Sequence, residues 1–298
     1  MCRMALVAAT VLSFAATSAL ATEPAAPAQP AAGGNVLQRM LGGGHHAPAT
    51  PTTPATAAAS AATPAPAPHA TAEQRAEAER LDPLARSAFW AHEAENDPRD
   101  VDAGVHLAHA LRDLGRYQEA AEAAERVLVV TPTSFEAMLE VGRGRIAQGQ
   151  GFYAIDPLQH AAAQQPGDYR PVSLLAVAYE QVQRDDEALA AYQRAVSMAP
   201  GNAGMVSNLA LYWAGHGDTA QAEQLLRRAV AMPSATAQTR QNLALVLGLQ
   251  GRLDEAERLE RQDLPPEVVA NNMAYLRAAA AGAGGGRTWD AVRGPQTP

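Results

Sequence analysis

The chain has 298 residues, a formal net charge of −8 and no lysine, so that all 23 basic residues are arginine. The negative charge argues against a general nucleic-acid binder, which needs a basic surface to displace the counterions of the phosphate backbone. The absence of lysine excludes P-loop nucleotide binding, protein-kinase chemistry and Schiff-base catalysis, each of which needs a lysine side chain.

Residues 1–21 have the three parts of a secretory signal peptide. Arg3 provides the positive start, Ala5–Ala16 is an apolar core, and Ala19–Ala21 is a small-x-small cleavage site. Cys2, the single cysteine, lies too close to the start to be a lipobox cysteine, so the mature chain would hold no thiol. No later apolar run is long enough to span a bilayer. We therefore expect a periplasmic protein of a Gram-negative bacterium without a transmembrane segment, which would associate with the outer membrane through a partner.

Residues 22–70 are dominated by alanine, proline and threonine, and they predict a disordered tether. Closely spaced prolines block both helix and sheet, and too few large apolar groups are present to offset the entropy cost of ordering. One island, Asn35–Leu41, interrupts the tether and has glycines on both sides. Its large apolar side chains could share one helical face, so the island is either a short docking peptide or a slightly less polar piece of linker.

From residue 101 onward the sequence repeats with a period of 34 residues. The five blocks are 101–134, 135–168, 169–202, 203–236 and 237–270. The eighth position is always small, namely Ala108, Gly142, Ala176, Ala210 and Ala244. The twentieth position is always alanine, namely Ala120, Ala154, Ala188, Ala222 and Ala256. The fifteenth position holds Gly115, Gly149, Gln183, Gly217 and Gly251.

Each block predicts a front helix and a back helix that run antiparallel and are joined by a turn. The small residues let the two helices approach closely, and glycine suits the turn because a positive φ is often needed there. A 34-residue helix-turn-helix unit of this kind resembles the tetratricopeptide repeat (TPR), so we expect an all-α TPR solenoid of antiparallel helix pairs over residues 71–281. A partial repeat containing Leu84–Pro98 would open the stack, and a helix over 267–281 would cap it before a flexible tail, 282–298.

One group of histidines and carboxylates has metal-ligand spacing along the first front helix. Its members are Asp102, His106, His109 and Asp113. Side chains at this spacing share one helix face and could bind zinc, but four residues along three turns cannot all reach one ion, so a solvated groove wall is favoured. A zinc-protease pattern that starts at His92 is incomplete, because Asn96 stands where the second histidine is needed. We therefore predict no catalytic residue, no metal site and no cofactor.

The second, fifth, ninth and twelfth positions of each front helix are expected to line the concave side of the stack. The predicted partner-binding groove consists of Val177, Leu211, Leu245, Arg143, His109, Ser173, Ser207, Gln241 and Gly248. Because only Arg143 and Arg170 in this lining are basic, a clamp for a partner's C-terminal carboxylate is disfavoured. An apolar peptide or amphipathic helix along the aliphatic members is favoured, and the alternative is that neighbouring helices cover some of them. Gly248 would widen the groove beside Leu245.

The stretch RQNLALVLGLQGRLDEAE, Arg240–Glu257, is followed by DLPPEVVANNMAYLRA, Asp263–Ala278. Together they resemble TadD, the TPR protein of the tight-adherence (Flp/Tad) pilus assembly system. The resemblance is most specific over Asn242–Ala278 and is weaker but collinear over the repeats from about residue 84. It implies a protein that assists assembly of the pilus secretin, usually as an outer-membrane lipoprotein. This chain departs from the family at its N-terminus, where an Ala-Leu-Ala signal site replaces the lipobox.

The sequence therefore predicts a non-catalytic scaffold of the cell envelope that holds a protein partner, such as a secretin, as a peptide or helix in its groove. One alternative is a periplasmic TPR adaptor of another envelope pathway, such as polysaccharide export or outer-membrane biogenesis. The alternative from a different class is a metal-dependent enzyme that uses the face of Asp102, His106 and His109. No nucleic acid is expected among the partners.

Overall fold

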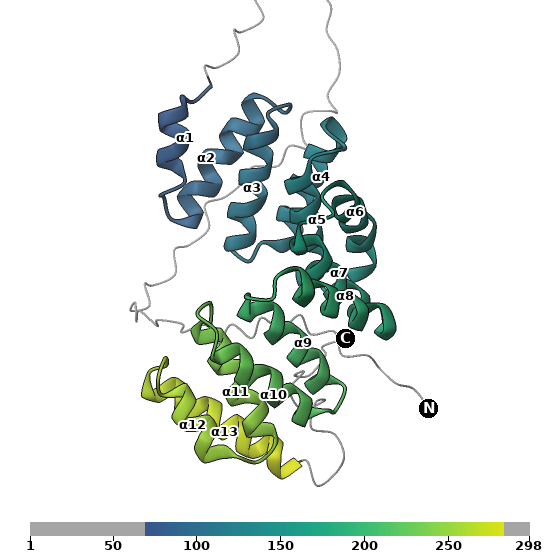
Figure 1. The fold of residues 1–298 in the computed structure, drawn as a ribbon. Coiled ribbons are helices and arrows are strands. Elements are labelled where there is room, and N and C mark those ends of the chain that lie inside the picture. Colours follow the sequence, from purple (N-terminus) through teal and green to yellow (C-terminus); the bar gives the residue numbers. More distant parts are fainter. Residues whose placement is uncertain (1–68, 283–298) are drawn as a thin grey trace, which may run out of the picture. The chain divides into compact units, whose positions relative to one another are not determined.

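The computed structural model describes residues 69–282, so the predicted signal peptide, the island Asn35–Leu41, the tail and nearly all of the tether lie outside the described residues (Figure 1). Within this part the chain forms thirteen α-helices and no strand, which confirms the all-α prediction. The helices are α1 Ala72–Ala78, α2 Pro83–Asn96, α3 Val101–Asp113, α4 Tyr117–Val130, α5 Phe135–Ala147, α6 Gly151–Gln164, α7 Tyr169–Gln181, α8 Asp185–Met198, α9 Ala203–Gly215, α10 Thr219–Val230, α11 Ala237–Leu249, α12 Leu253–Glu260 and α13 Pro266–Gly282. None of these helices is long and apolar enough to cross a bilayer.

The front helices α3, α5, α7, α9 and α11 each begin at the first residue of a predicted block. The residue before four of these helices is an N-cap whose side-chain oxygen accepts a hydrogen bond from a backbone N–H of the first turn, namely Asp100, Asp168, Asn202 and Thr236. Such a cap satisfies one of the donors that have no partner inside the helix. The 34-residue period is thus supported by local backbone chemistry as well as by the core.

The two helices of each repeat meet at the positions that the sequence keeps small. The eighth-position alanines and the twentieth-position alanines have no exposed surface. At Gly142 even one added carbon would lie 2.5 Å from Cδ2 of Leu158, so α5 and α6 approach more closely than a side chain at that position allows. Buried apolar residues then extend from each pair to the next in a chain of core clusters.

The two ends of the stack differ from its interior. At the start, α1 and α2 form the predicted partial repeat, with a short first helix. At the end, the back helix α12 stops at Glu260, and α13 begins at Pro266, inside the predicted block 237–270. Val269, Met273 and Leu276 of α13 are buried against α11 and its neighbours, so α13 covers the apolar end of the stack.

The turn between the two helices of a repeat uses a left-handed backbone. Gly115, Gly149, Gly217 and Gly251 have φ between 72° and 88°, where glycine avoids the Cβ clash that other residues suffer. In the third repeat the same conformation is taken by Gln183, with φ of 63°. Its side chain is exposed, so no packing contact offsets the unfavourable backbone conformation.

We expect Gln183→Gly to raise the free energy of unfolding by about 0.5 to 1 kcal/mol, because it removes the left-handed penalty of a residue with a Cβ. Urea denaturation followed by circular dichroism measures this change. The reverse substitution at the equivalent turn, Gly217→Gln, should lower the free energy of unfolding by a similar amount. A destabilised Gln183→Gly variant would show that the glutamine side chain has a stabilising role.

One buried carboxyl group lies in the middle of the stack. Glu180 of α7 is 9% exposed, and its Oε2 accepts a hydrogen bond of 2.7 Å from the hydroxyl of Tyr192 on α8. Burial raises the pKa of Glu180 from 4.5 to about 7, and the Tyr192 hydroxyl and the nearby His216 only partly oppose this rise. Desolvation disfavours the charged form of a buried carboxyl, so the folded protein holds this proton more tightly than the unfolded chain does.

The free energy of unfolding should therefore fall as the pH rises from about 4.5 to about 7, because the unfolded chain loses the Glu180 proton first. Glu180→Gln cannot titrate and keeps a side chain of the same shape. The stability difference between this variant and the wild-type protein should grow in favour of the variant by about 3 kcal/mol from pH 4.5 to pH 8. Urea titrations at the two pH values test this, and a constant difference would contradict it.

Candidate functional site

The predicted groove residues lie on the front helices, and the aliphatic ones are partly covered. Val177 on α7, Leu211 on α9 and Leu245 on α11 are half-buried. Val177 and Leu245 pack partly against the core clusters behind them, so each offers one side of its side chain to a partner. Gln241 is half-buried as well, and His109 is exposed.

A hollow of about 550 Å³ opens among the front helices α3, α5 and α7. It is lined by Val105, His106, His109, Arg112, Glu136, Glu140, Arg143 and Arg170. The arginines outnumber the glutamates in this lining, whereas the chain as a whole carries a net charge of −8. Asp113 and Asp168 lie beside the lining and pair with Arg112 and Arg170, so neighbouring carboxylates balance most of its positive charge.

A buried carboxylate organises the hollow. Glu140 of α5 is 3% exposed, and it accepts hydrogen bonds from Nε of Arg112 at 2.9 Å and from Nη1 of Arg143 at 2.6 Å. A buried carboxylate needs such charge-assisted partners, because an unpaired charge would be costly away from water. Glu140 therefore fixes two guanidinium groups from different helices at the wall of the hollow.

Arg112 and Arg143 differ in how many carboxylates already pair with them. Arg112 also lies 3.3 Å from Oδ1 of Asp113, so two carboxylates share it. Arg143 has Glu140 as its one hydrogen-bonding partner within residues 69–282, which leaves its Nε and Nη2 donors free. Planar guanidinium groups bind carboxylates through two parallel N–H donors, so Arg143 is equipped to receive an anionic group.

Arg170 closes the third side of the hollow from α7. Its Nη2 lies 2.8 Å from Oδ2 of Asp168 and 3.0 Å from Oε1 of Glu136. Hydrogen bonding from Arg170 lowers the pKa of the Asp168 carboxyl, which keeps that carboxyl ionised and the arginine in place. Because Glu136 belongs to α5, this arginine ties two neighbouring repeats together as well as lining the hollow.

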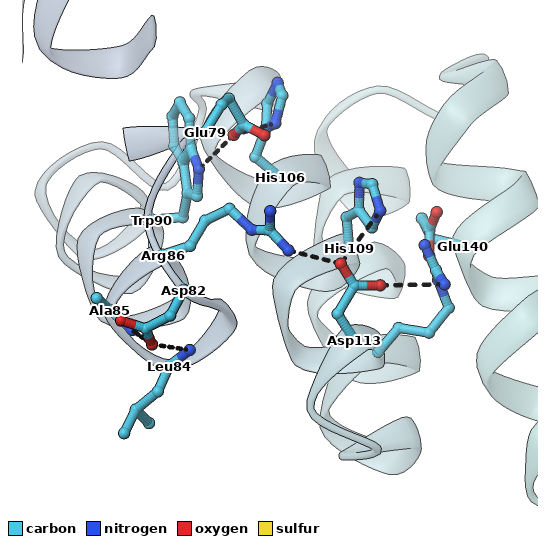
Figure 2. A network of polar contacts seen from close by, with 11 residues as sticks. Glu79, Asp82, Leu84, Ala85, Arg86, Trp90, His106, His109, Asp113 and Glu140 are labelled. Atoms are coloured by element: carbon cyan, nitrogen blue, oxygen red, sulfur yellow. Dashed lines mark hydrogen bonds and ion pairs between the residues drawn. The ribbon is translucent and has the colours of Figure 1, made fainter. Parts of the chain in front are cut away.

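The His and Asp residues with metal-ligand spacing do not converge on one point. Nδ1 of His106 lies 2.9 Å from Oε1 of Glu79, and its ring stacks on Trp90 with centroids 4.5 Å apart (Figure 2). Nε2 of His109 lies 3.5 Å from Oδ2 of Asp113, which Arg86 also contacts at 2.6 Å (Figure 2). Asp102 is exposed. His106 and Asp113 thus contact Glu79 and Arg86 of the preceding partial repeat, and His109 contacts Asp113 of its own helix.

A different trio in the described part, His69, Glu93 and Asp100, has ligand atoms within 4.8 Å of one another. Arg75 already bridges the two carboxylates, at 2.8 Å from Glu93 and 2.5 Å from Asp100. The guanidinium supplies the positive charge that a metal ion would bring. The two carboxylates are therefore satisfied by an ion-pair network that fastens α1 to α2 and to the N-cap of α3.

Three predicted groove residues are wrong as partner contacts. Ser173 and Ser207 are 8% and 3% exposed, because neighbouring helices cover the fifth positions in the middle of the stack. Gly248 is buried and faces α13, where an added Cβ would lie 2.5 Å from Cδ1 of Leu276. Its missing side chain makes room for the capping helix and does not widen the groove beside Leu245.

The prediction from sequence missed Arg112 and Glu140 as groove residues. Arg112 stands at the twelfth position of its block, and the twelfth position is one of those expected to face the groove. Its position in the repeat could therefore have identified it as a groove residue. Glu140 stands at the sixth position and gave no signal, because its importance depends on two arginines from α3 and α5 meeting at one carboxylate.

The comparisons with known proteins agree with this architecture. One tetratricopeptide repeat family model matches residues 105–131 and 236–264, and a second matches residues 172–204. None of the curated proteins matches the chain. The chain therefore carries tetratricopeptide repeats, which mediate protein–protein interaction, and neither matched family describes an enzyme.

Solved structures of TPR proteins share the fold. A tetratricopeptide repeat protein from Parabacteroides merdae is 14% identical, with 70% of this chain and 86% of that chain covered and a TM-score of 0.60. A thermophilic TPR protein from Thermus thermophilus is 24% identical, with 60% of this chain and 99% of that chain covered and a TM-score of 0.54. These likenesses support the all-α repeat fold.

Gly248→Val should lower the free energy of unfolding by about 2 kcal/mol or more, because the added carbons collide with Leu276 in a packed core. Thermal and urea denaturation measure the loss. Ala274→Val, at an exposed position of α13, is the matched control for placing valine in a helix, and its effect should be small. If Gly248→Val leaves the stability unchanged, Gly248 faces the groove and not α13.

Proposed function

We propose that the chain is a non-catalytic scaffold of the cell envelope whose front-helix groove holds a segment of a partner protein. The observation that carries the proposal is the buried Glu140, which positions Arg112 and Arg143 at the wall of a hollow where the front helices meet. Arg143 keeps free N–H donors at this wall, which the packing of the repeats does not use.

The partner segment has two chemical parts in this proposal. An acidic side chain enters the hollow, where the Nε and Nη2 groups of Arg143 are free to donate hydrogen bonds. Apolar side chains of the same segment then lie on Val177, Leu211 and Leu245, which continue along α7, α9 and α11. A peptide or an amphipathic helix that is acidic at one end and aliphatic along one face meets both demands.

The resemblance to TadD gives this scaffold a context. It favours a periplasmic protein that assists assembly of a Flp/Tad-type pilus or its secretin, with the signal peptide directing export. The second candidate is an adaptor of another envelope pathway, such as polysaccharide export or outer-membrane biogenesis, and it uses the same groove. The identity of the bound partner distinguishes the two.

Photo-crosslinking in living cells tests the groove and identifies its occupant. A benzophenone amino acid at Leu211 should capture one partner protein, whereas the same amino acid at Arg194, exposed on the back helix α8, should not. Arg143→Glu should weaken capture about tenfold or more, because one lost charge-assisted contact corresponds to at least about 1.4 kcal/mol. Leu211→Glu combined with Leu245→Glu should abolish binding of the purified partner.

The control for charge is Arg126→Glu, since Arg126 is exposed on the back helix α4. It should leave capture unchanged, and all variants should keep their helical content by circular dichroism. Equal losses for Arg126→Glu and Arg143→Glu would reject the hollow as the anchoring point. Capture of a pilus secretin supports the pilus role, and capture of a polysaccharide-export or outer-membrane-biogenesis component overturns it in favour of the second candidate.

A further inference from the structure

One junction of the stack is built differently from the others. At the junctions on either side, consecutive front helices pack directly, as α3 on α5, α5 on α7, α9 on α11 and α11 on α13. The pair α7 and α9 lacks a comparable contact. The contact of α8 with α9 is also less extensive than the equivalent contacts of α4 with α5 and of α6 with α7. The third and fourth repeats are therefore joined mainly through one helix pair.

The contact between α8 and α9 has an aromatic and polar part beside an aliphatic part. The rings of Tyr192 and Tyr212 have centroids 5.5 Å apart, and the Tyr212 hydroxyl donates to the backbone oxygen of Asp185 at 3.2 Å. Tyr212 also stacks on His216, with centroids 4.0 Å apart. The buried cluster around these rings consists of Ala176, Ala188, Tyr192, Leu209 and Tyr212. A second small cluster packs Val196 of α8 against Ala203 and Val206 of α9.

Glu180 lies directly behind this contact. Its carboxylate holds the hydroxyl of Tyr192, so the ring that meets α9 is positioned by a buried acid. The other titratable groups that interact with Glu180 are Tyr212 on α9, His216, which follows α9, and Asp185 at the start of α8. His216 lowers the pKa of Glu180 and Asp185 raises it, and these two side chains lie 3.6 Å apart. Burial raises the pKa of Glu180 to about 7, so this carboxyl changes its charge near neutral pH.

We propose that the junction of α8 and α9 is a hinge that closes when Glu180 is protonated and opens when its carboxylate is ionised. A neutral carboxyl tolerates burial behind Tyr192, whereas a carboxylate requires water or a cation. The contact of α8 with α9 is less extensive than the contacts of α7 with α6 and with α8, and its opening lets water reach the charge. The blocks α1–α8 and α9–α13 then change their relative orientation with pH.

The hinge divides the groove into two parts. The polar hollow belongs to α3, α5 and α7, whereas Leu211 and Leu245 belong to α9 and α11. Opening therefore changes the spacing between the acidic anchor and the aliphatic contacts of a bound segment, so that binding of both parts at once depends on pH. This consequence rests on the function proposed above, but the hinge itself does not require a partner, and each idea can fail separately.

Distances between spin labels test the hinge in the full chain with Cys2→Ser, which leaves the introduced cysteines as the only thiols. Labels at Ala163→Cys on α6 and Ala220→Cys on α10, both exposed, report across the junction. Double electron–electron resonance should give a narrow distance distribution at pH 5 and one that is broader and shifted by several ångströms at pH 8.5. The control pair Arg126→Cys and Ala163→Cys lies within the first block and should not change.

Glu180→Gln should keep the narrow distribution at both pH values. Tyr192→Phe removes a hydrogen bond that favours the ionised form, so it should move the midpoint of the distance change to higher pH. A wild-type distribution that is the same at pH 5 and pH 8.5 would overturn the hinge. A pH-dependent shift that survives Glu180→Gln, with no change of midpoint in Tyr192→Phe, would assign the effect to other groups such as His216.

Discussion

The close approach of two helices within each repeat is the constraint on which this structure depends. It is possible because the eighth and twentieth positions of every block are alanine or glycine, and the fit leaves no room for a Cβ at Gly142. Small residues bury little apolar area at each contact. The apolar end of the stack is covered by α13, which acts as a cap. In a solenoid each repeat contacts only its neighbours, so stability is distributed along the stack. A weaker contact at one junction therefore affects mainly the two repeats that meet there.

Buried carboxylates are the second element of the design, and their partners decide what each one does. Glu140 is satisfied by two arginines and presents them at a hollow. Among residues 69–282, Glu180 accepts a side-chain hydrogen bond from the Tyr192 hydroxyl alone, which does not offset its desolvation, so burial raises the pKa of this carboxyl. The same type of side chain thus serves the proposed binding surface in one repeat and the proposed pH-sensitive junction in the next, because guanidinium groups stabilise the ionised form and a phenol does so only weakly.

The proposed function and the proposed hinge meet at α7. This helix contributes Arg170 to the hollow, Val177 to the aliphatic stretch and Glu180 to the junction. Residues on a single rigid helix cannot move independently. A change in the contact between α8 and α9 would therefore alter the spacing between the two parts of the groove that meet at α7. If the proposed function and the proposed hinge both hold, capture of the partner depends on pH.

The sequence by itself determined the period, the starts of the five front helices, the left-handed turns and the small residues that let the helices pack, because each is enforced by local backbone chemistry or by repetition at a fixed spacing. Only the tertiary structure decided which surfaces remain open. Periodicity shows that residues share a helix face, but it does not show which neighbour covers that face. Ser173, Ser207 and Gly248 were therefore expected in the groove and are buried, the last under Leu276 of a helix outside the regular repeat. The hollow at Glu140 and the sparse contact between α7 and α9 likewise depend on side chains from different repeats, whose meeting no single stretch of sequence specifies.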